Sequence, residues 1–425
     1  TITGLGTAGL RGELTLPGDK SISHRSLLLC SLARGKSRIK NLAPGEDVLS
    51  TVGCLKALGV SLNEDEGAII VEGGGMRSFI GPEEPLDAGN SGTLTRLITG
   101  ILATHPFTVK IDGDRSLRSR PMKRIIRPLE AMGANIDSKD GKLPLSVTGG
   151  DLKGIEYEPK VASAQVKSSI ILAGLGASGR TVVREPGPSR DHTERMLEAM
   201  GYPIEVDGSR IEVGGPHELE PLELEVPGDF SSAGYFIAAG CLVEGSEIRI
   251  NSVGLNDTRT GFLELLNEMG ASIETMNYRV RNGEPIGDLV VSRSDLAGVR
   301  LTQADVVKAI DELPLLAVVA TQANGITEVR GAEELRVKET DRISATVENL
   351  KNLGADIEEL PDGFLVRGPT ELHGGRLESM GDHRIAMSMA VAALIAEGES
   401  ELVDPRWVEI SFPDFFETME GLLND

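Results

Sequence analysis

The pentapeptide Leu-Glu-Ala-Met-Gly at residues 129–133 occurs again, letter for letter, at residues 197–201. Two apolar residues three positions apart share one face of a helix, and a following glycine is typical of a left-handed helix C-terminus. Related pentapeptides stand at 55–59, 266–270 and 350–354, and the successive glycines are 74, 68, 69 and 84 residues apart. Self-similarity at a near-constant spacing indicates a repeat architecture. A single large doubly wound sheet, the alternative, predicts no such period.

A second, more apolar helix is expected upstream of each pentapeptide, followed by a strand. A helix that is apolar on most faces is buried on most faces, so each repeat should contribute one central helix and one more exposed helix. Residues 415–422 are expected to form a shortened sixth copy of the pentapeptide helix. The expected apolar helices lie near 26–33, 94–103, 168–177, 232–243, 313–321 and 384–395, and the expected strands are 37–42, 107–112, 180–185, 246–251, 326–331 and 400–405.

The composition favours an ordinary globular protein of two or three domains. The chain has 425 residues, of which 40% are hydrophobic and 25% charged. The net charge of −22 and the 3% of aromatic residues argue against a nucleic-acid or anionic-membrane surface, which needs a basic footprint. No apolar run approaches the roughly 18 residues that span a bilayer, and the first residues do not resemble a secretory signal. The three cysteines lie in apolar runs without metal-ligand spacing, which favours the reducing cytoplasm.

Several basic residues lie where an isolated helix would not favour them. Lys20, Arg25, Arg96 and Arg384 are expected in the first turns of helices, where a cation opposes the helix dipole by about 0.3–1 kcal/mol. The placement becomes favourable when an anion is bound, because helix N-termini bind phosphate and carboxylate groups. Several such helix ends at one place would form an anion trap. The corresponding segment 228–232 is expected to supply only helix caps.

Two further segments carry dense positive charge. Residues 110–130 hold seven cations and three carboxylates. Arg115, Arg118 and Arg120 are expected in a loop there and are the better ligand candidates, because a guanidinium binds carboxylate or phosphate through two nitrogens. Lys338 and Arg342 are expected one turn apart on one face of a helix, where they point at a common ligand or form salt bridges within the helix. Their spacing alone does not decide between these alternatives.

Taken together, the segments closely resemble the EPSP synthases of the enolpyruvyl transferase family. The matching stretches run through the chain in order. They are Leu-Pro-Gly-Asp-Lys-Ser-Ile-Ser-His-Arg (16–25), Gly-Asn-Ser-Gly-Thr (89–93), Arg-Ser-Arg-Pro-Met (118–122), Ser-Ala-Gln-Val-Lys-Ser (163–168), Ser-Arg-Asp-His-Thr-Glu (189–194), Asp-Glu-Leu-Pro (311–314), Arg-Val-Lys-Glu-Thr-Asp-Arg (336–342), Gly-Asp-His-Arg-Ile-Ala-Met (381–387) and Ser-Phe-Pro-Asp-Phe (411–415).

The resemblance implies an α/β fold of the inside-out barrel type, with two domains of three βαβαββ repeats each. Domain 1 would be residues 1–17 plus 227–425 and domain 2 residues 18–226, with the active site in the interdomain cleft. It also implies transfer of the enolpyruvyl group of phosphoenolpyruvate to the 5-hydroxyl of shikimate 3-phosphate, with release of phosphate. That reaction belongs to the shikimate pathway, which leads to chorismate and the aromatic amino acids. No metal or cofactor is implied, and a monomer is expected.

The resemblance also assigns roles to individual residues. Asp311 would be the base at the attacking hydroxyl, while Lys20 and Glu339 would exchange the proton at the enol methylene. The implied ligands of shikimate 3-phosphate are Lys20, Ser21, Arg25, Ser163, Gln165, Arg190, Asp311 and Lys338. The implied ligands of phosphoenolpyruvate are Lys20, Gly92, Arg120, Gln165, Arg342 and Arg384. Gly92 would leave room beside this second site, which predicts sensitivity to glyphosate, a competitor of phosphoenolpyruvate.

The chain departs from some family members at three places. Ile410 stands where some carry a lysine, Glu334 where some carry an asparagine, and Ala164 where some carry a serine. Two other functions are less consistent with the sequence. The sister enzyme that acts on UDP-N-acetylglucosamine is disfavoured because residues 112–122 contain no cysteine. A non-catalytic anion-binding repeat protein is disfavoured because Asp311 and Glu339 would weaken a pure anion trap.

Overall fold

The computed structural model describes residues 1–6 and 8–423, which form two compact units. Unit 1 comprises Thr1–Pro17, Pro227–Val280 and the described residues from Pro285 onward. Unit 2 comprises Gly18–Val226 and the short hairpin tip Arg281–Glu284. Each unit has its own hydrophobic core, and the two clusters of buried residues share no member.

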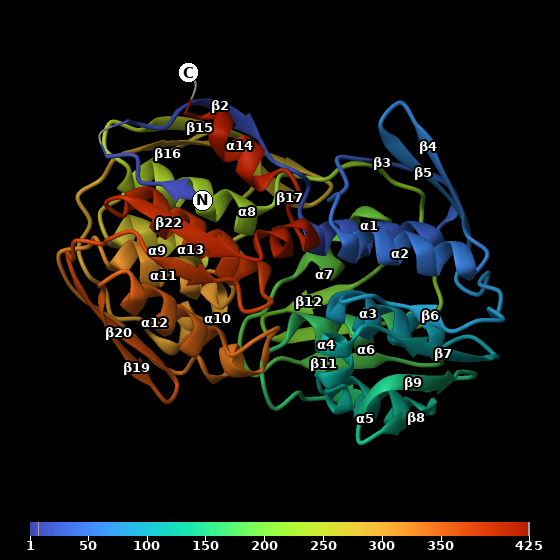
Figure 1. Cartoon of the computed structure of the whole chain (residues 1–425). Coiled ribbons are helices and arrows are strands. Elements are labelled where there is room, and N and C mark those ends of the chain that lie inside the picture. Colours follow the sequence, from blue (N-terminus) through green and yellow to red (C-terminus); the bar gives the residue numbers. More distant parts are fainter. Residues whose placement is uncertain (7, 424–425) are drawn as a thin grey trace. The chain divides into compact units, whose positions relative to one another are not determined.

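The described residues of unit 2 form three four-stranded sheets with one common plan (Figure 1). In each sheet a parallel pair of strands is followed by two antiparallel pairings, as the expected repeat requires. The sheets are β14-β3-β5-β4 (Glu223–Glu225, Arg34–Lys40, Ala68–Gly74, Ser61–Asp65), β6-β7-β9-β8 (Leu86–Asp87, Thr108–Asp112, Lys142–Thr148, Asn135–Lys139) and β10-β11-β13-β12 (Glu156–Tyr157, Thr181–Arg184, Arg210–Val213, Glu205–Asp207).

Unit 1 keeps this plan less completely in the sheets that its described residues form. One sheet has four strands and the other two have three each, and the sheet β18-β20-β19 has only antiparallel strand pairs, with isolated parallel bridges beside it. Strand β2 lies before the chain enters unit 2, yet it pairs in parallel with β15, which follows the return. The first and last parts of the chain are thereby joined in one unit. The sheets are β16-β17-β15-β2 (Ser272–Arg281, Glu284–Ser292, Glu247–Gly254, Arg11–Thr15), β18-β20-β19 (Gly325–Val329, Gly363–Gly368, Asp356–Leu360) and β1-β22-β21 (Ile2–Thr3, Glu399–Val403, Arg376–Glu378).

The apolar helices fill the interior of each unit, and the sheets lie outside them (Figure 1). All eight residues of α11 are buried, as are all residues of α8 except its last. This arrangement confirms the predicted inside-out α/β architecture. The central helices are α1 (Lys20–Leu32), α3 (Gly92–Leu102) and α6 (Ala164–Gly174) in unit 2, and α8 (Phe230–Leu242), α11 (Leu313–Ala320) and α13 (His383–Ile395) in unit 1.

The second set of helices carries the pentapeptides. The glycines at 59, 133, 201, 270 and 354 all have positive φ, between +76° and +113°, which a residue with a Cβ adopts only at a cost. The expected left-handed helix ends are therefore confirmed, and each glycine turns the chain into the next strand. These helices are α2 (Glu46–Ala57), α5 (Lys123–Met132), α7 (His192–Ala199), α9 (Gly261–Glu268), α12 (Arg342–Asn352) and α14 (Phe415–Gly421).

Two sequence predictions about local structure were wrong. The starts of α1 and α6, at Lys20 and Ala164, are not among them, because the expected ranges 26–33 and 168–177 are the apolar parts of these helices and Lys20 lies in a first turn as expected. Residues 115–119, expected as a loop, form the short helix α4 (Arg115–Ser119), whose N-terminal N–H groups are capped by Asp114. Lys338 lies before α12 rather than in it, because the 3-10 helix η1 (Glu333–Val337) ends there and Asp341 caps α12.

The remaining helical segments are α10 (Gln303–Ala309) and the 3-10 helix η2 (Pro405–Ile410). Within residues 1–6 and 8–423, no helix has the length and apolarity that a membrane crossing requires.

Candidate active site

The starts of the three central helices of unit 2 are tied to one another by side chains. The His24 ring on α1 lies 3.4 Å from the Ser91 hydroxyl, which caps α3. Arg25 donates to the Ser168 hydroxyl on α6 at 3.0 Å, and Arg96 on α3 donates to the Gln165 side chain at 2.6 Å. The N-termini of these helices, which belong to separate motifs in the sequence, therefore lie together in unit 2.

Arg25 is a buried guanidinium held on three sides. Its Nε donates to the Thr193 hydroxyl at 2.8 Å, and its two other nitrogens donate to Ser168 and to the Ser21 carbonyl, each at 3.0 Å. Burial lowers the pKa of Arg25 to about 10 although the carboxylates of Glu194 and Asp19 partly oppose this effect. A guanidinium whose burial is unfavourable and whose orientation is set by three hydrogen bonds is suited to binding an anion.

Lys20 begins the same helix and is half-buried. Its ammonium lies 3.1 Å from a carboxylate oxygen of Asp47, which comes from α2. Asp19 caps the helix by accepting from the Ile22 N–H at 2.8 Å. The unfavourable position of Lys20 in the first turn is thus compensated by two carboxylates.

Two guanidinium groups converge over Gly92 at the start of α3. A Cβ built on Gly92 would lie 2.7 Å from Arg96 Nη1 and 3.3 Å from Arg120 Nη1. Arg120 is held by the Asn90 side chain at 2.7 Å, and Gln165, which Arg96 also contacts, donates to the Thr93 hydroxyl at 2.9 Å. The structure therefore brings together Gly92, Arg120 and Gln165, as the resemblance implied, and adds Arg96 to them.

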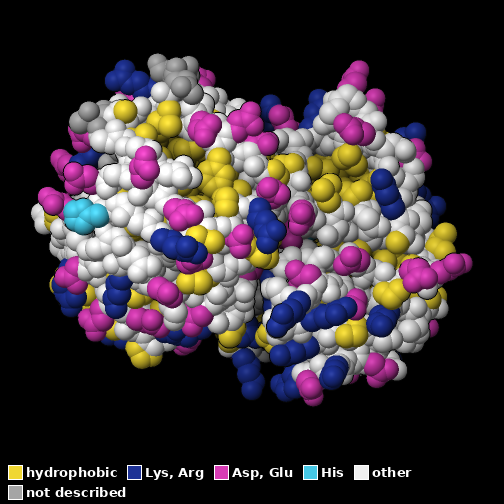
Figure 2. Space-filling model, in the orientation of Figure 1, with side chains coloured by type: hydrophobic (Ala, Val, Ile, Leu, Met, Phe, Trp, Pro, Cys, Tyr) yellow, Lys and Arg dark blue, Asp and Glu magenta, His cyan; other side chains and the backbone are white. Residues whose placement is uncertain are grey.

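Arg115 and Arg118 are not part of this arrangement. Arg118 forms a two-nitrogen ion pair with Asp112, at 2.8 and 2.7 Å, which occupies its guanidinium, and the Arg115 side chain is exposed. Their role as ligand candidates stays a prediction, and the ion pair with Asp112 competes with it at Arg118. Together with Lys123, Arg124 and Arg127 they contribute to the basic surface over α4 and α5 (Figure 2).

A fully buried ammonium supports the segment that carries Arg190. Lys167 on α6 lies 2.9 Å from Glu185 and 2.6 Å from Glu194, and its side chain is 1% exposed. It also donates to the Ser189 carbonyl at 3.4 Å, and Glu185 accepts a hydrogen bond from the Ser189 hydroxyl. Burial alone would lower the pKa of Lys167, but the two carboxylates outweigh it and raise the pKa. Lys167 belongs to the motif at 163–168, but sequence analysis assigned it no role.

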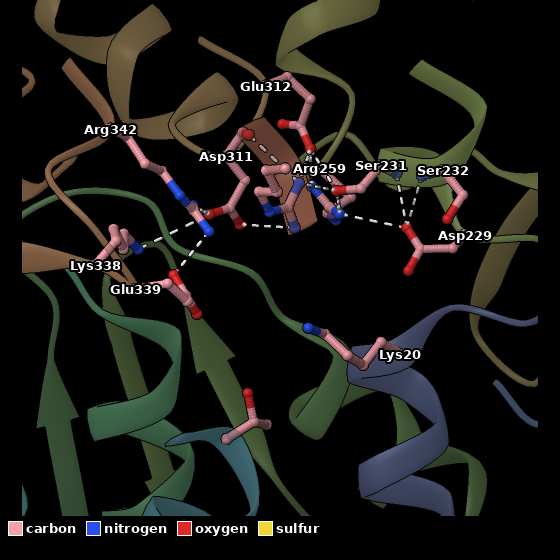
Figure 3. A network of polar contacts seen from close by, with 12 residues as sticks. Lys20, Asp229, Ser231, Ser232, Arg259, Asp311, Glu312, Lys338, Glu339 and Arg342 are labelled. Carbon is pink, nitrogen blue, oxygen red and sulfur yellow. Dashed lines mark hydrogen bonds and ion pairs between the residues drawn. The ribbon is translucent and has the colours of Figure 1, made fainter. Parts of the chain in front are cut away.

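Unit 1 has its own cluster, with Asp311 at the centre of three cations (Figure 3). Asp311 directly precedes the N-cap of α11. Its carboxylate lies 3.8 Å from Lys338, 3.4 Å from Arg342 and 3.7 Å from Arg384. The structure thus joins residues from three separate motifs, although Lys338 and Arg342 do not share a helix.

Arg342 is the most completely enclosed member of this cluster. Its side chain is 2% exposed, and it pairs through Nε and Nη2 with Asp382, whose side chain is 0% exposed. Nη2 also donates to Glu339 at 2.7 Å. Burial alone would lower the pKa of Arg342, but Asp382 and Glu339 outweigh it and raise the pKa above its usual value. Arg342 pairs with Glu339 just before its helix, and it shares Asp311 with Lys338, so the choice between a common ligand and salt bridges within the helix stays open.

The segment 228–232, which was expected to supply only helix caps, also contributes a side chain to this cluster. Asp229 does cap α8, but the Ser231 hydroxyl contacts Arg384, Arg259 and Glu312 (Figure 3). Sequence reasoning missed Arg259 and Glu312 as members of the cluster. Glu312 adjoins Asp311 in a motif, which was a usable signal, whereas Arg259 lies in a turn-like segment that gave none.

Two other predicted features can be placed. Ile410, at the end of η2, is buried, so this position holds no charged side chain where some family members carry a lysine.

Residues 1–6 and 8–423 contain no group of three or more His, Cys, Asp or Glu side chains arranged to hold a metal ion.

Comparison with known proteins gives one consistent result. A sequence model of EPSP synthase (3-phosphoshikimate 1-carboxyvinyltransferase) matches residues 6–419. The 3-phosphoshikimate 1-carboxyvinyltransferase of Persephonella marina is 49% identical over 422 residues, 98% of each chain. That of Brevibacillus brevis is 47% identical over 412 residues, 96% of this chain and 97% of the relative.

Solved structures agree with the sequence relatives. The EPSP synthase of Acinetobacter baumannii superposes with a TM-score of 0.89 at 41% identity, covering 99% of this chain and 97% of that one. The enolpyruvyl transferase NikO from Streptomyces tendae shares the fold, with a TM-score of 0.80 at 19% identity over 99% of this chain and 96% of that one. The chain belongs to the EPSP synthase family of transferases.

Proposed function

We propose that this chain transfers the enolpyruvyl group of phosphoenolpyruvate to the 5-hydroxyl of shikimate 3-phosphate and releases phosphate. Lys20, Ser21, Arg25, Ser163, Gln165, Arg190, Asp311 and Lys338 would bind shikimate 3-phosphate, and Lys20, Gly92, Arg120, Gln165, Arg342 and Arg384 would bind phosphoenolpyruvate. Each set has members in both units.

The observation that carries the proposal is the position of Asp311 among Lys338, Arg342 and Arg384. Cations alone would suffice for an anion-binding protein, and a carboxylate among them weakens anion binding. A carboxylate is needed, however, where a hydroxyl must lose a proton next to a bound anion. Asp311 meets that need, while the surrounding cations hold the negatively charged groups of both substrates.

The steps follow from these residue types. Lys20 or Glu339 delivers a proton to the methylene carbon of phosphoenolpyruvate, which leaves cationic character on the adjacent carbon. The 5-hydroxyl attacks that carbon as Asp311 accepts its proton, and a tetrahedral adduct forms. Removal of a proton from the new methyl group restores the double bond, and the carbon–oxygen bond to phosphate breaks. The basic clamps stabilise charge on the phosphate as it leaves.

A phosphate-release assay tests the proposal. Purified protein is incubated with phosphoenolpyruvate and either shikimate 3-phosphate or UDP-N-acetylglucosamine. We expect release only with shikimate 3-phosphate. Release with the nucleotide sugar alone would assign the sister reaction, and release with neither would favour a non-catalytic anion-binding protein.

We expect Gly92→Ala to weaken inhibition by glyphosate and binding of phosphoenolpyruvate together. The added methyl group would lie 2.7 Å from Arg96 Nη1 and 3.3 Å from Arg120 Nη1, so both guanidinium groups must move. Overpacking typically costs about 1–3 kcal/mol, so glyphosate inhibition should weaken about 5- to 150-fold. Inhibition constants against phosphoenolpyruvate measure this effect. Gly53→Ala is the control, because a Cβ there meets nothing within 4 Å, and equal effects in both variants would contradict the prediction.

We expect Lys167→Met to raise the KM for shikimate 3-phosphate about 10-fold and to lower stability. The change leaves Glu185 and Glu194 buried without their cation, which typically costs 3–5 kcal/mol. The segment carrying Arg190 and the Thr193 hydroxyl that holds Arg25 then lose their support. Steady-state kinetics and urea unfolding measure both effects. Lys36→Met, at an exposed ion pair with Glu72, should change neither, and an unchanged KM in Lys167→Met would refute the role.

We propose further that the protein acts as a monomer in the cytoplasm. The three cysteines are buried and free, which suits a reducing compartment. Size-exclusion chromatography with light scattering tests the oligomeric state.

A further inference from the structure

Behind the proposed phosphoenolpyruvate ligand Arg384 lies a buried polar cluster that the reaction does not use directly. Its members are Ser231 at the start of α8, Arg259 just before α9, and Glu312, the N-cap of α11. The Arg259 and Glu312 side chains are 3% and 1% exposed, and Ser231 is 5% exposed. Burying a charged pair is costly, and such a pair is weak evidence for stability by itself. Its position next to Arg384 indicates another purpose.

The Ser231 hydroxyl is the centre of the cluster (Figure 3). It accepts hydrogen bonds from Arg384 Nη1, at 3.0 Å, and from Arg259 Nη2, and it donates to Glu312 Oε1. A hydroxyl has one hydrogen to donate and two lone pairs to accept with, so its capacity is fully used. The direction of all three bonds is therefore determined, with Arg384 Nη1 as one of the two donors to the hydroxyl.

The cluster engages one end of the Arg384 guanidinium and leaves the other end toward Asp311. Nη1 contacts Ser231, Glu312 at 3.4 Å and the Asp311 carbonyl at 3.3 Å. Nη2 lies 3.7 Å from the Asp311 carboxylate, the group proposed to act as the base. An anion at Nη2 would consequently be placed beside that base.

Arg259 controls how strongly Glu312 attracts Arg384. Glu312 Oε1 accepts from Arg259 Nη1 at 3.0 Å, closer than its contact of 3.4 Å with Arg384. With Arg259 present, the charge of Glu312 is largely balanced. Without Arg259, the carboxylate would have Arg384 as its nearest cation and would draw it away from the ligand. Without Glu312, two guanidinium groups would share one hydroxyl and repel each other.

We propose that Ser231, Arg259 and Glu312 are positioning residues that orient Arg384 for phosphoenolpyruvate. This inference rests on the proposed function, because it takes Arg384 as a ligand of that substrate. Glu312 adjoins Asp311 along the chain, but the side-chain bonds of the cluster lead to Arg384, which is proposed to bind phosphoenolpyruvate alone. Its effect should therefore fall mainly on that substrate, whereas a merely structural cluster would affect stability and both substrates alike.

The test compares Arg259→Gln with Arg249→Gln. Arg249 pairs with Asp288 at 2.7 Å in the sheet of the same unit and contacts none of the proposed ligands, so it is a matched control. We expect Arg259→Gln to raise the KM for phosphoenolpyruvate about 10- to 100-fold, the range for losing a hydrogen bond to a charged group. The KM for shikimate 3-phosphate should stay close to that of the unchanged protein. Arg249→Gln should leave both KM values unchanged.

A milder variant and a double-mutant cycle exclude a folding defect as the cause. Ser231→Ala removes one oxygen atom and should raise the KM for phosphoenolpyruvate in the same direction. Combined with Arg384→Lys, its effect should largely disappear, because both changes act on the same interaction. Additive effects, an unchanged KM for phosphoenolpyruvate, or equal increases for both substrates would overturn the proposal.

Direct binding separates this proposal from the proposed function. Calorimetric titration of the unchanged protein, Arg259→Gln and Arg249→Gln with phosphoenolpyruvate, in the presence of shikimate 3-phosphate, needs no turnover. Weaker binding in Arg259→Gln alone supports the positioning role even if phosphate release fails. Equal binding in all three proteins refutes that role even if the reaction proceeds as proposed.

Discussion

Asp311→Asn is expected to lower kcat by about 10²- to 10⁴-fold, the range for loss of a general base. The asparagine has nearly the same shape but cannot accept the hydroxyl proton. It also removes a negative charge that lies 3.4 Å from Arg342 and 3.7 Å from Arg384. Because that carboxylate competes with the substrate for both cations, phosphoenolpyruvate should bind as tightly as before or more tightly. Loss of turnover should therefore accompany retained or improved binding.

Single-turnover kinetics and calorimetric titration with phosphoenolpyruvate measure the two effects separately. Asp356→Asn serves as the control, because Asp356 also pairs with an arginine, Arg367 at 3.2 Å, but its side chain is 59% exposed. It should change neither quantity. Asp311 would lose its proposed role if Asp311→Asn turned over at the rate of the unchanged protein. Weaker binding of phosphoenolpyruvate would show instead that Asp311 mainly maintains the geometry of its cations.

The fold could be predicted where the sequence carries local, repeated signals. The pentapeptide glycines depend only on their own backbone conformation, so their positive φ values followed from sequence spacing. The interiors of the central helices followed from apolar residues on all faces. Apolar periodicity did not detect the polar first turns of α1 and α6, which cap residues and cations indicated instead. The partners of these polar side chains did not follow, because they are distant in sequence: Arg25 bonds to Thr193, 168 residues away along the chain.

The site could be predicted only in part, for a related reason. Lys20, Arg25 and Arg384 were recognisable because a cation in a first helical turn opposes the dipole and requires an explanation. Arg118 was also a ligand candidate, but its guanidinium forms an ion pair with Asp112, six residues away. Arg259 was missed because its partners Ser231 and Glu312 are 28 and 53 residues away and its own segment resembles an ordinary turn. Ion pairs between residues that are far apart in the sequence depend on the fold, so a local sequence pattern does not predict them.

Carboxylates also surround the cations of unit 1 more fully than an anion trap requires. Arg342 alone contacts Asp311, Glu339 and Asp382. Two of these are proposed to move protons, but Asp382 is completely buried and caps α13 by accepting from the Arg384 N–H at 2.8 Å. Arg342 therefore has two separable tasks. It neutralises the buried carboxylate that caps α13, and it is proposed to offer its charge to the substrate.

Arg342→Met is expected to lower stability by about 3–5 kcal/mol, the usual cost of leaving one partner of a buried pair uncompensated. It should also lower kcat/KM for phosphoenolpyruvate about 100-fold or more, because a buried charge that faces the anion is lost. The double variant Arg342→Met/Asp382→Asn should recover much of the stability, since the uncompensated charge is removed and asparagine still caps a helix well. Its activity should remain low.

Urea unfolding followed by circular dichroism, together with steady-state kinetics, measures this separation. If the double variant regained activity along with stability, Arg342 would be a structural residue and the proposed phosphoenolpyruvate site would lose one of its cations. If both variants stayed equally unstable, Asp382 would tolerate burial without Arg342, contrary to its side-chain exposure of 0%. Recovery of stability alone is the result that assigns the Arg342 charge to the substrate, because the variant then folds and lacks only the group that faces the anion.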